Sequence, residues 1–412
     1  MKECRQQRQI ASNLGVSVVN KHLPPKEYTV VIDAVFGVGL SRTIEGHYKD
    51  VIEEMNQIHA EKVAIDIPSG ISSFDGQVLG TAFHADLTVS FACEKLGTVL
   101  FPGSDYAGEV IPVEIGIGTK LFEENPEVCY TLEKSDLSKF LPDRKKNSHK
   151  GSYGKILMIT GSKGMSGAAY LSARAAYISG GGLVQIYTEE SNRTILQQLL
   201  PEAIVSTYTE YEEEKLQSLL KWADVICIGC GLGKSRTAGQ ILSYLMKYAE
   251  VPCVIDADGL NLLADHMELL PKEKKPFVLT PHMKEMAGLL GCTIPELGKN
   301  RFAALKEFTD SYGVVCALKD ARTLVAGKDR QMFLNTAGNS AMAKAGSGDV
   351  LAGVITGLLA QHMKVYEGTV LGVYLHACGG DAARERRGAY SVLAEDLTEG
   401  IAACIKKTEK GR

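Results

Sequence analysis

The sequence lacks the features that mark membrane, secreted and nucleic-acid-binding proteins. No segment reaches the ~18 consecutive apolar residues of a membrane span. The first residues, MKECRQQRQI, are charged and have no apolar centre of the kind found in signal peptides. Basic residues form only short runs and the formal net charge is −4, so the charge gives no reason to expect a nucleic-acid partner. We therefore expect a cytoplasmic protein without a membrane segment or a nucleic-acid partner.

Cysteine pairs of the kind that bind zinc or form disulfides are also scarce. The ten cysteines are scattered, mostly in apolar contexts that suit reduced, buried thiols. Cys227 and Cys230 have the spacing of a redox or zinc pair, but no second pair or histidine cluster accompanies them. Cys227 also lies inside the apolar run 223–228. We favour a structural role for this pair over a metal or redox role.

What the sequence does contain is two blocks in which apolar runs alternate with helix-like segments. Its 412 residues, 45% hydrophobic and 23% charged, suit a globular chain of two or three domains. In the first block the runs 28–35, 62–67 and 85–92 end near Gly, Pro or Ser, and 48–60 has a helical pattern. This alternation predicts a parallel sheet with crossover helices. The polar stretch 123–150 is the expected boundary.

The second block repeats the alternation over more residues and predicts a doubly wound α/β domain. Helical patterns include 168–178 and 238–248. In such a fold, ligands bind beyond the carboxyl ends of the strands. Most of the glycine-rich and polar segments of this block lie at those strand ends. The expected strands are 155–160, 183–187, 225–228, 253–255, 277–279 and 314–318.

Residues 339–360 (NSAMAKAGSGDVLAGVITGLLA) join a glycine-rich turn to an apolar helix. From Asp349 onward the apolar residues recur at helical spacing. The turn Gly346-Ser347-Gly348 therefore presents backbone N–H groups at a helix N-terminus, where an anion is favoured. Asp349 would stand beside that anion as the base that activates a hydroxyl for phosphoryl transfer. The alternative is an ordinary loop-to-helix junction in which Asp349 is a cap.

Two more glycine-rich turns follow strands of the second block. Residues 161–167 (GSKGMSG) suit a close approach of backbone amides to a phosphate or carbonyl. Residues 229–235 (GCGLGKS) resemble a Walker A loop, but three residues separate the first Gly from the Gly-Lys pair where a P-loop has four. We therefore do not expect a true P-loop here.

Polar side chains follow three further strands. Asp256, Asp258 and Asn261 suit binding of magnesium or a ribose, or helix capping by Asp258. His282 and Glu285 are three residues apart and share a face of a starting helix, where His282 either hydrogen-bonds a substrate or is a surface histidine.

The turn 319–323 (KDART) ends the last of these strands. It carries two cations and a hydroxyl, which suits contacts with a polyphosphate. Such signals recur at successive strand ends, and their recurrence indicates a nucleotide site.

Taken in order, the segments SKGMSGAA, GCGLG, DADGLN, TPHMKE, LKDART and AGSGDVLAG resemble the ADP/ATP-dependent NAD(P)H-hydrate dehydratases, a branch of the ribokinase-like superfamily. The resemblance covers residues 133–412. The segments DAVFGVGLSR, IDIPSG and ADLTVSF are similar to the NAD(P)H-hydrate epimerase domain that bacteria often fuse ahead of the dehydratase. The resemblance implies two doubly wound α/β domains, a partial Rossmann-like epimerase-type domain (1–125) and a ribokinase-like dehydratase domain (133–412).

The resemblance implies repair of NADH or NADPH that has been hydrated at the C5–C6 double bond. A nucleotide, with Mg²⁺ bridging its phosphates, would phosphorylate the C6 hydroxyl of the S hydrate, and phosphate elimination would restore the double bond. Asp349 would accept the hydroxyl proton. Fused bacterial members resemble ADP users, so we expect ADP in preference to ATP. The hydrate would contact Gly229, Gly231, His282, Glu285 and Asp349, and the nucleotide would contact Lys319, Asp320, Ala321, Arg322, Thr323, Asn339, Gly346, Ser347 and Gly348.

For the first block the resemblance implies an epimerase-type site. Asp33 and Ser69 would bind K⁺, and Asp66 would contact the substrate near the chemistry. The family's epimerase domain begins upstream, with an early strand and an Asn-Asn-Gly-Gly-Asp-Gly-like loop that this sequence does not contain. We therefore expect epimerisation to be absent or badly impaired, and one edge of the first sheet to be unpaired. The substrate phosphates would lie on Gly37, Val38, Gly39, Leu40, Ser41, Arg42 and Thr43.

Two other functions fit some of the same residues. A ribokinase-like kinase of a sugar or vitamin alcohol would also use the GSGD turn and Asp349, but TPHMKE and the epimerase-like block favour hydrate repair. A non-catalytic nucleotide-binding scaffold would keep the fold without turnover, and the intact AGSGD and LKDART segments argue against it. The resemblance also suggests a homo-oligomer.

Overall fold

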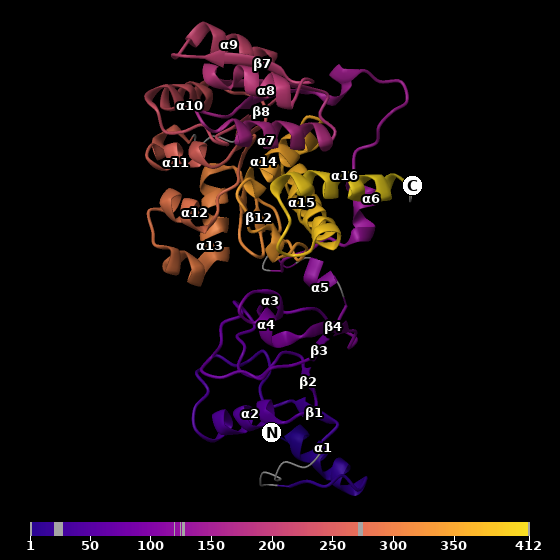
Figure 1. The fold of residues 1–412 in the computed structure, drawn as a ribbon. Coiled ribbons are helices and arrows are strands. Elements are labelled where there is room, and N and C mark those ends of the chain that lie inside the picture. The colour runs from indigo at the N-terminus through magenta and orange to yellow at the C-terminus, as the bar shows by residue number, and fades with distance from the viewer. Residues whose placement is uncertain are drawn as a thin grey trace. The chain divides into compact units, whose positions relative to one another are not determined.

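The computed structural model describes residues 2–19, 28–118, 120–123, 125, 128–270 and 275–410. The chain divides into two compact units, Met1–Gly118 and Thr119–Arg412 (Figure 1). Each unit is a sheet with helices packed against it. Met1 and Arg412, the outer ends of the two expected domains, lie outside the described residues.

The first unit is a four-stranded parallel sheet in the order β1-β2-β3-β4. Its strands are β1 (Val30–Asp33), β2 (Glu61–Ile65), β3 (Leu87–Phe91) and β4 (Glu109–Val113), and its helices are α1 (Lys2–Asn13), α2 (His47–Gln57), α3 (Leu96–Val99) and α4 (Ser104–Ala107). The three expected strands are confirmed, and the expected helix ends three residues early, at Gln57. In the part of this unit that the structure describes, β1 forms one sheet edge, and Ile32 on it is 61% exposed.

The second unit is built on a nine-stranded sheet in the order β13-β12-β11-β10-β9-β8-β5-β6-β7. The strands from β7 to β11 are parallel, whereas β12 and β13 continue the sheet antiparallel. The central strands are fully buried because helices cover both faces, as in doubly wound folds. The strands are β5 (Lys155–Ile159), β6 (Leu183–Glu189), β7 (Ile204–Tyr208), β8 (Val225–Ile228), β9 (Cys253–Ile255), β10 (Phe277–Leu279), β11 (Val315–Leu318), β12 (Leu324–Ala326) and β13 (Phe333–Leu334).

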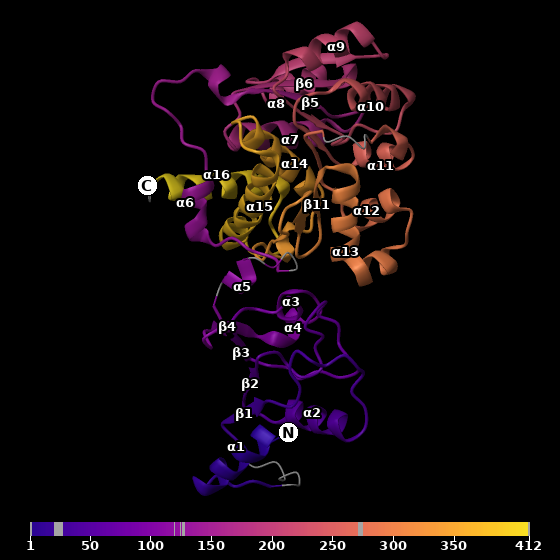
Figure 2. The same cartoon turned by 180° about the vertical axis from the view of Figure 1, so that it is seen from behind.

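Helix α14 lies in the middle of the second unit, where it packs against α7 and α15 (Figure 2). The α7–α14 contact is close because α14 carries Gly353, where an added Cβ would lie 2.1 Å from the Ser172 carbonyl oxygen of α7. The helices are α5 (Lys120–Glu123), α6 (Leu137–Phe140), α7 (Ser166–Ile178), α8 (Arg193–Leu199), α9 (Glu213–Trp222), α10 (Arg236–Tyr248), α11 (Asp258–Ala264), α12 (Met283–Leu290), α13 (Ile294–Tyr312), α14 (Ser347–Leu359), α15 (Val365–Arg387) and α16 (Ala394–Lys410).

Parallel strands bring the polar segments of the sequence to one edge of this sheet. The glycine turns follow β5 and β8, Asp256 follows β9, His282 follows β10 and Lys319 follows β11. The turn 319–323 therefore lies between β11 and its antiparallel neighbour β12.

No helix among the described residues is long and apolar enough to cross a membrane. All ten cysteines are free thiols, and the buried ones include Cys227 and Cys230.

Candidate active site

The N-terminus of α14 has the geometry of an anion site. Gly346 precedes the helix with φ 91°, and an added Cβ there would lie 2.7 Å from the Leu171 side chain, so only glycine fits without strain. Ser347 begins the helix and Asp349 lies in its first turn. The first amides of a helix have no intrahelical acceptor and point out of its end. The cap position belongs to Gly346, so the alternative interpretation of Asp349 as a cap is wrong.

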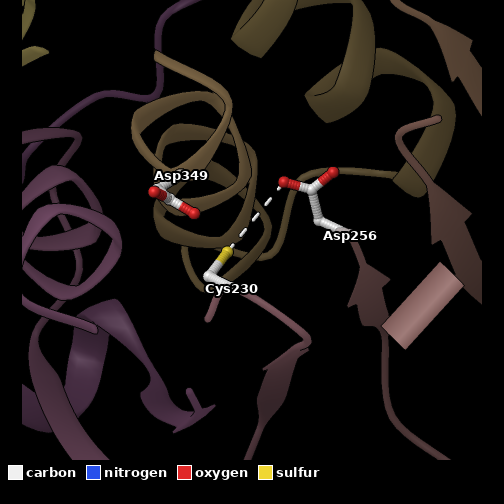
Figure 3. A group of neighbouring side chains, drawn as sticks. All are labelled: Cys230, Asp256 and Asp349. Carbon is white, nitrogen blue, oxygen red and sulfur yellow. Dashed lines mark hydrogen bonds between the residues drawn. The ribbon is translucent and has the colours of Figure 1, made fainter. Parts of the chain in front are cut away.

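Asp349 is half-buried and lies next to two buried residues, Asp256 and Cys230. One carboxylate oxygen of each aspartate and the thiol sulfur all lie within 4.8 Å of one another (Figure 3). Burial and then the negative charge of Asp256 raise the pKa of Asp349 to about 6. A carboxylate with this pKa is ionised at neutral pH and is a better proton acceptor than an ordinary aspartate. Among the described residues Asp349 forms no ion pair, so its carboxylate is available as a base.

Lys319 supplies a cation at the same place. Its Nζ lies 2.6 Å from Asp256 Oδ1, and only 20% of the lysine side chain and 2% of the aspartate side chain are exposed. Burial lowers the pKa of Lys319, but the charges of Asp256 and Glu285 outweigh burial and the pKa is raised. A Cβ added to Gly348 would lie 3.4 Å from Lys319 Nζ. A permanent ammonium therefore faces the amide-lined end of α14, as a phosphoryl site requires.

Asp256 and Asp258 have different roles. Asp256 forms the ion pair with Lys319, so one of its oxygens already faces a cation. Asp258 Oδ2 accepts a 2.8 Å hydrogen bond from the Gly233 amide, and the cap position of α11 belongs to Ala257. The capping interpretation of Asp258 is therefore wrong, because this side chain instead fixes the turn after β8. Asn261 lies within α11.

The turn after β8 connects three strand ends. Gly229, Gly231 and Gly233 all have positive φ, and a Cβ on Gly229 would lie 1.8 Å from the Asp256 carbonyl oxygen. The Gly161 amide, after β5, donates to the Cys230 carbonyl at 2.9 Å. The following Lys234 lines a cavity of about 670 Å³ along α10, and Asp349 is not among the residues that line this cavity. This segment therefore serves as a tight turn beneath Asp349.

His282 and Glu285 form a reciprocal cap at the start of α12. The Glu285 amide donates to His282 Nδ1 at 3.1 Å, and the His282 amide donates to Glu285 Oε2 at 2.8 Å. The His282 side chain is 51% exposed, whereas that of Glu285 is 7% exposed. Burial raises the pKa of Glu285, and the charge of Lys319 opposes this rise. The exposed imidazole remains open to a substrate.

The remaining residues expected to contact the nucleotide are held by local contacts. Asp320 pairs with Arg301 at 3.1 Å, and the Ala321 amide donates to Asp320 Oδ1. Thr323 is largely buried and donates to the Asp320 carbonyl. Arg322 Nη1 donates to the Thr336 carbonyl at 2.8 Å. These contacts fix the β11–β12 turn and tie it to the segment after β13.

Asn339 and two residues of α15 complete the surroundings of the α14 N-terminus. Asn339 donates to Asp381 at 2.8 Å. His376 Nε2 lies 3.4 Å from the Ser347 hydroxyl, and burial lowers the pKa of this histidine to about 4, so it is neutral. The sequence analysis missed His376 and Asp381, because they lie inside a 23-residue helix of mostly small and apolar residues.

The sequence analysis also missed the position of Cys230. It is buried, as expected, but it lies against Asp256 and Asp349 and not only in the core. The only sequence signal was its place in the turn directly after an apolar strand.

The first unit brings Asp33 and Ser69 together. Ser69 donates its amide to Asp33 Oδ2 at 2.7 Å and its hydroxyl to Asp33 Oδ1 at 2.6 Å, and both residues are buried. The Phe36 amide in turn donates to the Ser69 hydroxyl at 2.8 Å. Burial raises the pKa of Asp33, although these hydrogen bonds oppose the rise. The neighbouring loop 37–43 is mostly exposed.

Asp66 lies at the end of β2 in a strained backbone conformation with φ 73°. Its Oδ1 accepts from the Phe91 amide at 3.0 Å and from Lys95. Lys95 was not expected from the sequence, and it also donates to the Phe91 carbonyl at 2.7 Å. Lys95, on the segment after β3, thus orients the partly buried carboxylate of Asp66.

The second unit is a doubly wound domain with an amide-lined helix N-terminus, a carboxylate in the first turn of that helix and an adjacent lysine, and this arrangement is typical of ribokinase-like folds. The comparisons agree. A family model described as NAD(P)H-hydrate dehydratase matches residues 156–403, and one described as YjeF-related protein N-terminus matches residues 1–97. The chain therefore belongs to the family of bifunctional NAD(P)H-hydrate repair enzymes.

Relatives and solved structures support this assignment. The chain is 36% identical to the bifunctional NAD(P)H-hydrate repair enzyme of Moorella thermoacetica, over 92% of this chain and 73% of that protein. It is 33% identical to the Escherichia coli enzyme of the same name, over 90% of this chain and 71% of that protein. Among solved structures, a ribokinase-like superfamily protein of Enterococcus faecalis has a TM-score of 0.61 and 31% identity, and covers 68% of this chain and 95% of its own.

A second similar structure was solved from crystals grown with a nucleotide. The ADP/ATP-dependent NAD(P)H-hydrate dehydratase of Bacillus subtilis, co-crystallised with ATP and Mg²⁺, has a TM-score of 0.57 and 29% identity. The match covers 67% of this chain and 97% of that one.

Proposed function

We propose that the second unit dehydrates the S form of hydrated NADH or NADPH at the expense of a nucleotide, with ADP as the preferred donor and ATP as the alternative. The observation that carries the proposal is the position of Asp349. Its carboxylate lies in the first turn of α14, beside the amides of the Gly346–Gly348 turn and near the Lys319 ammonium. Family membership supports the choice of a hydrated nicotinamide as substrate.

The chemistry follows from this arrangement. Hydroxide is a poor leaving group, so the C6 hydroxyl is first converted to a phosphate ester. Asp349 takes the hydroxyl proton while the oxygen forms a bond to the terminal phosphorus, and the bond from that phosphorus to the rest of the nucleotide breaks. The Gly346–Gly348 amides and Lys319 stabilise charge on the transferring phosphoryl group. Phosphate then leaves C6 with its bonding electrons, a proton leaves C5, and the C5–C6 double bond is restored.

The remaining expected residues are assigned on the same basis. The hydrate lies against Gly229, Gly231, His282 and Glu285. Magnesium enters as part of the Mg²⁺–nucleotide substrate, as the ATP and Mg²⁺ of the Bacillus subtilis relative suggest. The nucleotide contacts Lys319, Asp320, Ala321, Arg322, Thr323, Asn339, Gly346, Ser347 and Gly348.

The test is recovery of reduced-nicotinamide absorbance from hydrated NADH or NADPH, with ADP and ATP compared. Recovery that needs a nucleotide supports the proposal. Nucleotide binding without turnover of any hydrate would instead favour a scaffold. Phosphorylation of a sugar or vitamin alcohol without recovery would favour a small-molecule kinase.

For the first unit we propose an epimerase-type site that interconverts the R and S hydrates. Asp33 and Ser69 offer only oxygen ligands in a buried place, which suits K⁺ as a hard cation. Asp66 is the residue nearest the chemistry. The rate at which the purified chain converts the R hydrate to the S hydrate tests this proposal. The loop that would hold the substrate phosphates comprises Gly37, Val38, Gly39, Leu40, Ser41, Arg42 and Thr43.

Three further proposals concern the whole chain. We propose that the two domains span residues 1–125 and 133–412. We also propose that the protein is cytoplasmic and forms a homo-oligomer. Size-exclusion chromatography with light scattering tests the oligomeric state, and a chain that elutes as a monomer would contradict it.

A further inference from the structure

Arg301, on helix α13, contacts the turn 319–323, which is expected to bind the nucleotide. Its Nη1 lies 3.1 Å from Asp320 Oδ2. We propose that Arg301 is a positioning residue for the nucleotide, which fixes the turn through Asp320 so that the turn is already ordered when ADP binds. This inference rests on the proposed function, because it takes the turn 319–323 as part of the nucleotide site.

Asp320 is held at both of its carboxylate oxygens. Arg301 pairs with Oδ2, and the Ala321 amide donates to Oδ1 at 2.9 Å. The Asp320 carbonyl also accepts from the Thr323 hydroxyl at 3.4 Å, a long contact. The Asp320 carboxylate therefore closes the turn on itself and links it to Arg301.

Other contacts of this turn come from neighbouring strand ends. The Lys319 amide donates to the Pro281 carbonyl, after β10, at 2.7 Å. Arg322 donates to the Thr336 carbonyl, after β13, at 2.8 Å. Arg301 instead reaches the turn from a helix, 19 residues before its partner in the sequence. Its ion pair therefore adds an attachment between the two strand-end contacts.

Stability alone does not explain an arginine at position 301. The Arg301 side chain is 11% exposed, and its Nε is buried with no hydrogen-bond partner in the part of the chain that the structure describes. A buried donor without a partner costs stability, and an apolar side chain of similar length would avoid this cost. The contact with Asp320 is therefore better explained by the order that it gives to the turn.

Loss of Arg301 should weaken nucleotide binding more than it weakens the fold. Asp320 is 42% exposed, so water can solvate its carboxylate when the guanidinium is removed. The turn would then be less ordered in the free protein, and ADP would have to order it on binding. In Arg301→Met we expect the Kd for ADP to rise about three- to tenfold. The KM for the hydrate should stay unchanged.

Isothermal titration calorimetry with ADP and Mg²⁺ measures this Kd without turnover. The matched control is Lys306→Met on the same helix. Lys306 pairs with Asp310 at 2.8 Å, and Asp310 is 41% exposed, close to the exposure of Asp320. Both partners of this pair lie on α13, so the control should leave the Kd unchanged. An unchanged Kd in Arg301→Met, or an equal rise in Lys306→Met, would overturn the proposal.

A double-substitution cycle tests whether Arg301 acts through Asp320. Asp320→Asn should itself raise the Kd for ADP. Arg301→Met should add no further loss of affinity in the Asp320→Asn background, because the pair is already broken there. Losses that multiply would show that Arg301 acts independently of Asp320, and the positioning role would be wrong.

Stability and turnover separate the remaining outcomes. The urea midpoint of Arg301→Met should stay near the wild-type value, whereas a large fall would indicate a general structural role and contradict the proposal. If Arg301→Met does not fold, Arg301→Gln decides, since it also removes the charge and an unchanged Kd would again overturn the proposal. Loss of ADP affinity as expected, with no dehydration of hydrate by the wild type, would refute the proposed function alone.

Discussion

At the scale of single residues, the site depends on contacts between side chains that lie far apart in the sequence. Lys319 pairs with Asp256, 63 residues away, and Cys230 meets Asp349 across more than a hundred residues. The sequence predicted Asp349 because its signal is local, a glycine turn that leads into an apolar helix. It did not predict Cys230 or His376, because no local pattern says which strand end or helix face they meet.

The raised pKa of Asp349 predicts a cost in stability. Its pKa rises from 3.8 in the unfolded chain to about 6 in the fold, so the folded state disfavours the charge. This penalty is absent below about pH 4 and fully present above about pH 6. Asp349→Asn removes it and should stabilise the protein by about 1–3 kcal/mol at pH 8, but not at pH 4. Urea unfolding at both pH values measures the effect, and an equal effect at both would contradict this explanation.

Lys319→Met should have the opposite effect on stability. It leaves Asp256 buried at 2% exposure without its cation, and breaking such a pair typically costs about 3 kcal/mol or more. The urea midpoint should fall accordingly at pH 7. Surface lysine Lys139, which pairs with Asp136 and is 69% exposed, provides the matched control: Lys139→Met should change the midpoint little. Equal effects of the two substitutions would refute the importance of the buried pair.

At the scale of elements, the strands whose apolar runs stop abruptly at a polar or glycine residue were predicted well. The expected bounds of β8, β9 and β10 agree with the structure to the residue. The sequence analysis missed β12 and β13, which have only three and two residues and no periodicity of their own. It also missed β4, where Pro112 and Glu109 interrupt the apolar run; proline is tolerated there because β4 is an edge strand.

The contact between α14 and α7 predicts the effect of a single methyl group. Gly353→Ala places a Cβ 2.1 Å from the Ser172 carbonyl oxygen, and we expect a loss of about 2 kcal/mol. Gly239→Ala in α10 meets nothing within 4 Å and should stabilise the protein by about 0.5–1 kcal/mol. Thermal unfolding of both variants tests the packing; a harmless Gly353→Ala would mean that α14 can move off α7.

At the scale of the whole molecule, two α/β units, each with a mostly or wholly parallel sheet, carry two different sites on one chain. The sequence predicted this arrangement from alternating apolar and helical segments and from two sets of motifs. The structure also shows an interaction that fixes the side chains of each site. It is the Asp33–Ser69 hydrogen bond in the first unit and the Lys319–Asp256 ion pair in the second. Both lie at the carboxyl ends of parallel strands, as such sheets require.

The two sites should respond separately to mutation. Asp66→Asn removes the carboxylate that Lys95 contacts and should lower the R-to-S conversion rate at least tenfold below that of the unmodified chain. Dehydration of the S hydrate should remain unchanged. Both rates can be followed in one chromatographic assay, and a parallel loss of dehydration would show that the two activities are not independent.

The central claim is that Asp349 accepts the proton of the C6 hydroxyl as the phosphoryl group arrives. The most direct measurement is nucleotide-dependent dehydration of the S hydrate by the wild type and by Asp349→Asn, with folding checked by circular dichroism. We predict that the variant folds normally and loses about 10²–10⁴-fold in kcat, the range typical for loss of a general base. A folded variant with a near-wild-type rate would contradict the claim.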